Sequence, residues 1–253
     1  MPDALATFGK ITQKTMAFTL AETLIVMGVI GIVSALTLPN LNSSTGDKEI
    51  VAKVKKIYQN LNDALGRAEA VYGPYDTWFI NDTTDAQKTT RFAQRISEFM
   101  KVSKDCAMAT GGGCANAGTV KYLNPKGGNP DMGQLDINSN YKIITADGTG
   151  MYFYYFNNSS IGSSIHVDID GPTKGPFVEG KDIFHFSVDK VHGGIIPEGL
   201  NIGFSNMLDH SYTGTAGAAW IVRFDNADYL KFTNSSGLCK SGTTVTEANP
   251  RCK

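Results

Sequence analysis

Residues 18–39 read FTLAETLIVMGVIGIVSALTLP, and this stretch decides how the rest of the chain is organised. From Phe18 to Leu38 nearly every side chain is apolar, and the run stops at Pro39. A helix over these positions would span about 31 Å, close to the thickness of the hydrocarbon core of a bilayer. We therefore expect a membrane-spanning helix that breaks or kinks at Pro39, because proline lacks an N–H group.

Glu22 is the one charged side chain inside this apolar run. A charge within a membrane helix costs about 2.5–3.5 kcal/mol on insertion scales, so such residues usually have a partner. No basic residue lies at helical spacing from Glu22. If the chain were cut before Phe18, the new α-amino group of a neighbouring copy could act as that partner.

The segment AFTLAE, residues 17–22, resembles the prepilin cleavage site, in which a small residue precedes Phe-Thr-Leu-x-Glu and an apolar helix. Type IV pilins, type II secretion pseudopilins and competence pseudopilins share this site. The resemblance covers about the first forty residues. It implies that a membrane peptidase removes the leader 1–17 on the cytoplasmic side and methylates Phe18, and that Glu22 guides docking of subunits into a filament. The family usually has glycine before the cut, where this chain has Ala17.

Two other interpretations of the apolar run stay open. It could be the core of a secretory signal peptide, with a small-residue cleavage site at Val33-Ser34-Ala35, or a plain transmembrane anchor. Glu22 argues against both, because neither needs a carboxylate early in the apolar run.

Composition narrows the class of protein. The 253 residues carry a net charge of −1, and loss of a leader with one acid and two lysines would make it −2. This balance lacks the excess of positive charge that binds the phosphates of nucleic acid, so we expect no nucleic-acid partner. Hydrophobic residues make up 42% of the chain, which fits one membrane segment and a globular domain over 40–253.

The four cysteines, all downstream of the apolar run, indicate an oxidising compartment. Three pairings are possible, and we expect the local one, Cys106–Cys114 and Cys239–Cys252, because three glycines let the first spacer turn back. A zinc site is the rival interpretation, but the spacing is not the two-residue kind that zinc favours. The second pair resembles, in position only, the C-terminal disulfide loop of many pilins.

The helical pattern resumes beyond a polar hinge at 40–46. Apolar residues recur every three or four positions, which predicts an amphipathic helix over 47–72 that ends at Gly73-Pro74. We expect the lysines at 48–56 to lie on its solvated face, with contact to lipid headgroups or a neighbouring subunit as the alternative. A second helix is predicted over 86–102, followed by an irregular region over 103–140 with one strand at 119–123.

Strand signals dominate from Tyr141 onward. A hairpin is predicted from 141–146 and 151–156 around Asp147-Gly148, and further strands at 164–169 and 182–188. In the last of these we expect Phe184 to face the core and Ile183 to pack on the other side. Residues 219–224 are predicted as a strand, and 228–232 as a short turn or strand.

Asp168, Asp170 and Asp182 flank a Gly- and Pro-rich segment and are the candidate ligands for Ca²⁺. Only two of them are close in sequence, and the spacing is not that of an EF-hand. Turn chemistry explains Asp, Gly and Pro here without a metal. We therefore expect a structural turn and no cofactor, with a calcium site as the alternative.

Catalytic signatures are weak, so we expect no enzyme and no catalytic residue. Asp209-His210-Ser211 places three triad residue types side by side, but adjacent residues rarely converge as a triad does. The triple glycine at 111–113 precedes no helix with Lys-Ser or Lys-Thr, as a phosphate loop would require.

Taken with the resemblance, these features predict an α+β, pilin-like fold, in which a long N-terminal helix packs its second half on an antiparallel sheet. The resemblance implies a structural subunit of a type IV pilus or type II secretion pseudopilus in the bacterial inner membrane, with a cytoplasmic N-terminus. Its expected partners are prepilin peptidase, other pilin or pseudopilin subunits, the inner-membrane assembly machinery and membrane lipid. The alternatives are a membrane-anchored binding protein or adhesin, and a DNA-uptake pseudopilin.

Overall fold

The computed structural model describes residues 19–126 and 128–253, except the side chains of residues 34–45 and 126. The chain divides into two compact units, Met1–Thr45 and Gly46–Lys253. Helix α1, Leu20–Tyr72, contributes residues to both.

The backbone is helical through Pro39 and through 40–46, so the predicted hinge is wrong and Pro39 does not end the helix; the alternative of a kink at Pro39 stays a prediction. Proline removes only one helical hydrogen bond, and the loss is confined to one turn. Continuing a helix adds one bond for each residue fixed, whereas restarting it needs a new nucleus. The weak helix propensities of Asn, Ser, Thr and Gly therefore do not end α1. It ends after Tyr72, as expected, and Gly73 adopts a positive φ of 81°.

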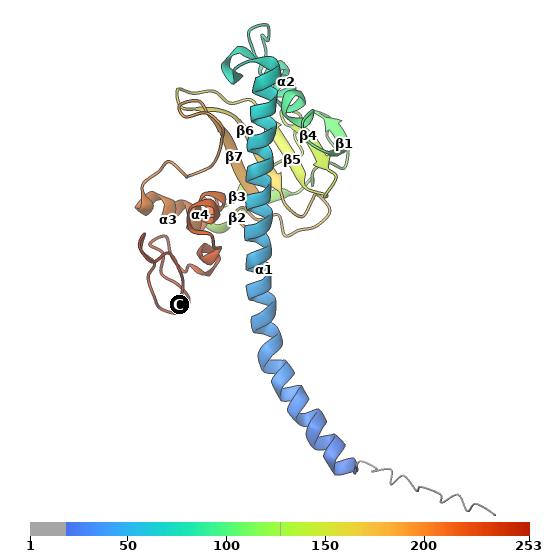
Figure 1. Ribbon diagram of the computed structural model, residues 1–253, viewed down its shortest axis with the longest axis vertical. Coiled ribbons are helices and arrows are strands. Elements are labelled where there is room, and N and C mark those ends of the chain that lie inside the picture. The colour runs from blue at the N-terminus through green and yellow to red at the C-terminus, as the bar shows by residue number, and fades with distance from the viewer. Residues whose placement is uncertain (1–18, 127) are drawn as a thin grey trace, which may run out of the picture. The chain divides into compact units, whose positions relative to one another are not determined.

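Within the unit Gly46–Lys253, one face of α1 forms the centre of the hydrophobic core. The buried positions on this face recur at the predicted helical spacing: Val54, Ile57, Leu61, Leu65 and Ala68. They pack against side chains from one face of the large sheet, and Tyr58 stacks on Phe186 with ring centroids 6.3 Å apart. Figure 1 shows α1 crossing this sheet.

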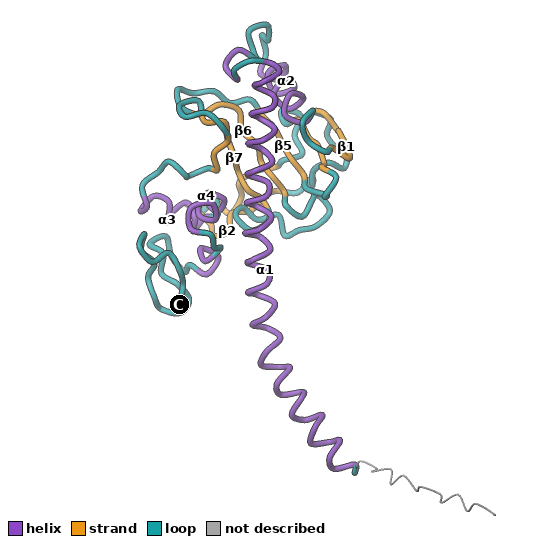
Figure 2. The backbone as a smooth tube through the Cα atoms, in the orientation of Figure 1, coloured by secondary structure: helices purple, strands orange, loops and turns teal. Residues whose placement is uncertain are grey.

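The described residues form a six-stranded sheet in the order β1-β4-β5-β6-β7-β8, in which every pairing is antiparallel. Its strands are β1 Val102–Ala107, β4 Tyr141–Thr145, β5 Gly150–Tyr154, β6 Ile161–Asp168, β7 Ile183–Asp189 and β8 Ile195–Pro197. A separate hairpin pairs β2 Thr119–Lys126 with β3 Asn129–Gln134. Figure 2 separates these strands from the helices around them. The α+β class and the antiparallel sheet are thus confirmed.

Side-chain alternation gives the large sheet two different faces. On β7, Phe184 and Phe186 join the core beneath α1, while Ile183 points to the other face, as expected. There it packs with Tyr152, Val120 and further residues in a second, smaller cluster. This cluster contains residues of both the sheet and the β2–β3 hairpin, so the hairpin covers part of the second face.

Several predicted elements need correction. The second helix, α2, is shorter than expected at Asp85–Ser97 and begins with a capping box between Thr84 and Gln87. The region 103–140 holds three strands instead of one. Helix α3, Phe204–Thr213, and strand β8 were not predicted. Residues Asp228–Lys231 form a 3-10 turn, η2, which fits the expected short turn.

The predicted strand at 219–224 is wrong, since these residues belong to helix α4, Gly217–Phe224. The residues from Gly217 to Ile221 are all buried, so the sequence of this segment does not alternate between apolar and polar residues at helical spacing. Periodicity alone does not separate such a buried helix from a buried strand. Trp220 anchors α4, with its indole N–H donating to Asn226 Oδ1 over 2.9 Å.

Candidate functional site

The expected processing residues, Ala17 and Phe18, lie outside the described residues, and the description begins at Thr19. Thr19 and Glu22 form a reciprocal cap at the start of α1. The backbone N–H and the hydroxyl of Thr19 donate to Glu22 Oε2 over 2.9 and 2.8 Å, and the Glu22 N–H donates to Thr19 Oγ1 over 3.3 Å. This is the capping-box arrangement, Thr-x-x-Glu, which satisfies donors at a helix start. Glu22 therefore has a structural role that the sequence reasoning missed.

The helix beyond this cap exposes apolar side chains on all sides. The large apolar residues between 20 and 33 are each between 52% and 80% exposed: Leu20, Leu24, Ile25, Val26, Met27, Val29, Ile30, Ile32 and Val33. Fourteen residues make almost four turns, so no side of this segment is polar. A helix that is apolar all round is normally covered by protein or lipid.

Within the part of the chain that the structure describes, no helix is both long enough and apolar enough to cross a membrane. Of the expected span 18–39, residue 18 and the side chains of 34–39 are outside the description.

Three lysines of α1 each form an ion pair with an aspartate from a different loop of the globular unit. These pairs are Lys53–Asp170 at 2.6 Å, Lys55–Asp225 at 2.9 Å and Lys56–Asp147 at 2.8 Å. The side chains stay partly exposed, but their charges are matched within the unit. The expectation of a merely solvated face thus needs correction, and these pairs tie α1 to the loops around the sheet.

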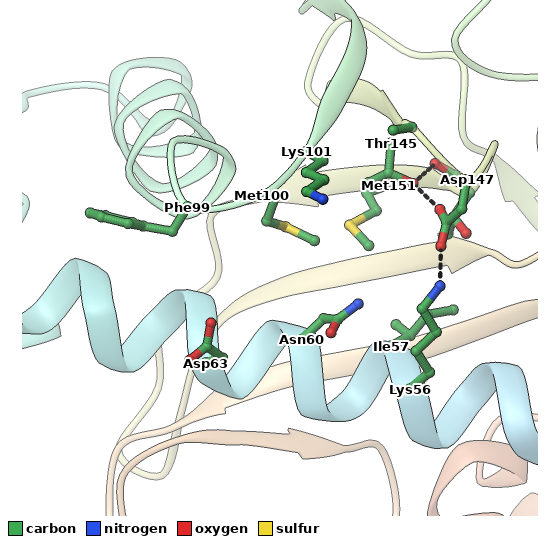
Figure 3. Close-up of a pocket in the computed structure, with 12 residues that line it drawn as sticks. Lys56, Ile57, Asn60, Asp63, Phe99, Met100, Lys101, Thr145, Asp147 and Met151 are labelled. Atoms are coloured by element: carbon green, nitrogen blue, oxygen red, sulfur yellow. Dashed lines mark hydrogen bonds and ion pairs between the residues drawn. The ribbon is translucent and has the colours of Figure 1, made fainter.

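Lys56 and Asp147 also line a cavity of about 490 Å³ between α1 and the β4–β5 hairpin. In Figure 3, Lys56 and Asn60 project from α1 toward the hairpin, and dashed lines join Asp147 to Lys56 and Thr145. Burial alone would raise the pKa of Asp147, but hydrogen bonds from Lys56, Thr145 and Thr149 hold it well below its usual range. Of the charged residues that line this cavity, Lys56 and Asp147 pair with each other, and Asp63 lies 3.6 Å from Arg67.

The three candidate calcium ligands serve as turn and ion-pair residues. Asp168 Oδ1 accepts the backbone N–H groups of Asp170 and Gly171 over 3.2 and 2.9 Å. Asp182 accepts those of Phe177 and Val178 over 2.6 and 2.5 Å, while Asp170 pairs with a lysine of α1. Among the described residues, no group of three or more His, Cys, Asp or Glu side chains is arranged to hold a metal ion. The geometry thus agrees with the structural turn.

Two buried acids, Asp168 and Glu179, have pKa values that burial raises. Asp168 is fully buried, and its Oδ2 has no hydrogen-bond partner among the described residues. Burial raises the pKa of Asp168 to about 7, and its backbone hydrogen bonds offset only part of the effect. Glu179 is 1% exposed, and in the part of the chain that the structure describes neither of its carboxylate oxygens has a hydrogen-bond partner. Burial, followed by the charges of Glu198 and Asp182, raises the pKa of Glu179 well above its ordinary value. Nothing in the sequence marked Glu179, since burial of one acid in a loop has no local signal.

Both expected disulfides form with the local pairing. Cys106–Cys114 closes the glycine-rich loop after β1, and Cys239–Cys252 closes the C-terminal loop. Cys114 and Cys239 are buried, so each bridge ties its loop to the packed part of the unit. No zinc site is needed to explain the cysteines.

Asp209, His210 and Ser211 are successive residues of α3, where neighbours project about 100° apart around the axis. They therefore do not converge as a catalytic triad. Ser211 is fully buried, and its hydroxyl makes no hydrogen bond with any described residue.

The chain matches no protein-family model, no curated protein and no solved structure.

Proposed function

We propose that this protein is a structural subunit of a type IV pilus or a type II secretion pseudopilus. In this proposal the leader 1–17 is removed by prepilin peptidase, and the new N-terminus at Phe18 is methylated. The subunit then sits in the bacterial inner membrane through its N-terminal helix and enters a filament, with the globular unit on the outer side.

The observation that carries the proposal is the surface of α1 between Leu20 and Val33. These side chains are apolar on every side of the helix and exposed, and Glu22 is the only charged residue among them. An exposed apolar surface of this kind is stable when lipid or other helices cover it. A filament that grows out of a membrane provides both. A single carboxylate at the start of the helix gives subunits a polar point of register.

The globular unit is compatible with this role. Two disulfides fit an exported domain, since disulfides persist in oxidising compartments. The long α1 presents one face to the antiparallel sheet, so the same helix can serve both the membrane segment and the folded unit.

The proposal is tested on protein purified from the native cell. Mass spectrometry of the N-terminus should find a chain that begins at methylated Phe18, and the same chain should be recovered in sheared surface filaments or in an overexpressed pseudopilus. An intact Met1 terminus, or cleavage after Ala35, would refute it.

One observation favours a second candidate, a membrane-anchored exported binding protein. The carboxylate of Glu22 is already occupied by Thr19, so Glu22 has a role that needs no neighbouring subunit. If capping were its only role, the helix would be a plain anchor. The two candidates differ in whether the charge of Glu22 matters or only its hydrogen bonds.

A further inference from the structure

A second cavity, of about 630 Å³, lies between the loop that joins β3 to β4, the start of α2, and the ends of β5 and β6. This volume falls in the range of about 300–1,000 Å³ that is usual for small-molecule sites. The sheet contributes His166 and Tyr154, which alternate with the core residues Ile165 and Phe153 and so point away from α1.

His166 is held rigidly at this cavity. Its ring stacks on His185 with centroids 4.3 Å apart and on Tyr154 with centroids 5.4 Å apart. The hydroxyl of Tyr154 and Nε2 of His185 are 3.1 Å apart, which fixes both neighbours. The orientation of the imidazole is therefore set before any ligand arrives.

The polar atoms of His166 are unsatisfied within the described residues. Nδ1 is enclosed and has no partner, whereas Nε2 is accessible at the cavity and makes no hydrogen bond. Burial, and then the neighbouring His185, lower the pKa of His166 well below its ordinary value, so the ring is neutral at neutral pH. A neutral imidazole offers a ligand either an N–H or a lone pair, depending on its tautomer.

Other polar side chains around the cavity are also free to bind a ligand. Gln134, Asn138 and Ser139 line it, and their side chains make no hydrogen bond with any described residue. The charged residue among the lining groups is Asp85, which is mostly exposed and lies 3.8 Å from Lys88. The cavity thus presents amide, hydroxyl and imidazole groups without an unbalanced charge that would select phosphate or ammonium.

The remaining walls are apolar or aromatic: Met108, Met132, Leu135, Ile137 and Tyr155. Such walls match a ligand that has hydrophobic faces as well as polar edges.

We propose that this cavity binds uncharged sugar units of a carbohydrate. Sugar hydroxyls both donate and accept, so they satisfy a neutral histidine in either tautomer as well as the carboxamides of Gln134 and Asn138. The C–H faces of a sugar ring suit the methionine and aromatic walls. The site lies within the unit Gly46–Lys253 and does not depend on whether the chain assembles into filaments.

The test is ligand-observed saturation-transfer NMR on the full chain in a detergent without sugar groups. The probes are maltotriose, cellotriose, chitotriose and lactose, with inorganic phosphate and trialanine as comparison ligands. At least one sugar should receive saturation, and a titration should give its Kd. His166→Phe keeps a stacked ring but removes both nitrogens, and it should weaken binding about tenfold, as expected for loss of a hydrogen bond to the ligand.

Two further variants make the result specific. Asn138 is exposed, so Asn138→Ala should leave the fold intact and weaken binding several-fold. Asn81 is equally exposed but does not line the cavity, and Asn81→Ala should bind like the unaltered protein. The proposal is overturned if none of the four sugars binds, if phosphate or trialanine binds in their place, or if sugar binding survives unchanged in both His166→Phe and Asn138→Ala.

Discussion

Thr19 and Glu22 bind each other at the start of α1, with the hydroxyl of Thr19 donating to the carboxylate of Glu22 over 2.8 Å. The FTLAE sequence thus contains a capping box as well as the proposed processing motif. Within a single chain the carboxylate of Glu22 already accepts hydrogen bonds from Thr19. The α-amino group of a neighbouring subunit would therefore have to join or replace this contact. Substitutions at Glu22 can therefore separate the two roles. Capping of Thr19 needs only a hydrogen-bond acceptor, whereas docking to a neighbouring α-amino group needs the negative charge.

Asp168 predicts how stability depends on pH. Its pKa is raised by burial from 3.8 in the unfolded chain to about 7, so folding favours the protonated acid. This contribution to the free energy of unfolding is fully present below pH 3.8 and is lost as the pH rises through about 7. At about 1.4 kcal/mol for each pH unit between these values, the loss amounts to at most about 4 kcal/mol.

Asp168→Asn should therefore be more stable than the unaltered protein at pH 8, because the amide keeps an acceptor for Asp170 and Gly171 without a buried charge. Urea unfolding between pH 4 and 8 measures this. Asp63→Asn, which changes an exposed carboxylate, is the control and should leave the pH profile unchanged. Equal pH profiles for Asp168→Asn and the unaltered protein would contradict the assignment.

Gly214 and Gly242 both have positive φ angles, but only Gly214 is crowded. A Cβ at Gly214 would lie 2.0 Å from the carbonyl oxygen of Glu179, whereas one at Gly242 would have nothing within 4 Å. Gly242→Ala should cost about 1–2 kcal/mol, for the left-handed conformation alone. Gly214→Ala should cost at least about 2 kcal/mol more or prevent folding. Chemical denaturation of the two variants measures the difference, and similar losses would count against the close approach.

The Lys56–Asp147 pair should contribute little by itself, because both side chains are about half exposed. A double-mutant cycle with alanine should give a coupling energy of about 0.2–1 kcal/mol that falls with added salt. Asp147→Ala should cost more than Lys56→Ala, since Asp147 also accepts the hydroxyl of Thr145 over 2.6 Å. Lys48→Ala, on the same helix, is the control. A coupling energy above about 2 kcal/mol would contradict this account, because a half-exposed ion pair does not contribute so much.

Elements with a clear period or turn signal could be predicted from the sequence. The amphipathic part of α1 buries residues at a spacing of three or four, and the β4–β5 hairpin follows from the turn signal Asp147-Gly148 between two strand-forming segments. The local disulfides follow from short, flexible spacers. In each case the deciding interactions lie close together along the chain.

Elements that depend on distant contacts could not be predicted. Strand β1 has exposed side chains and two register irregularities, and it is a strand because it pairs with β4. The first five residues of helix α4, Gly217 to Ile221, are all buried, which hides its period. The cavity at His166 combines residues from α2, β3, β5 and β6 with the loop that follows β3, so no segment carries its signal. The cap between Thr19 and Glu22 has the sequence signature Thr-x-x-Glu, but the same residues were interpreted only through their resemblance to a processing motif.

The measurement that tests the proposed function most directly is filament recovery of three variants expressed in the native cell. Glu22→Gln keeps the acceptor needed to cap Thr19 but removes the charge, and Glu22→Ala removes both. Thr19→Ala keeps the charge but loses the two hydrogen bonds of the cap that use the Thr19 hydroxyl. A subunit that docks through the charge of Glu22 should be cleaved and inserted in all three cases. Only Thr19→Ala should then be recovered in sheared filaments, and Glu22→Gln should fail as completely as Glu22→Ala. Normal recovery of processed Glu22→Gln would contradict this account and reduce Glu22 to a helix cap on a plain anchor.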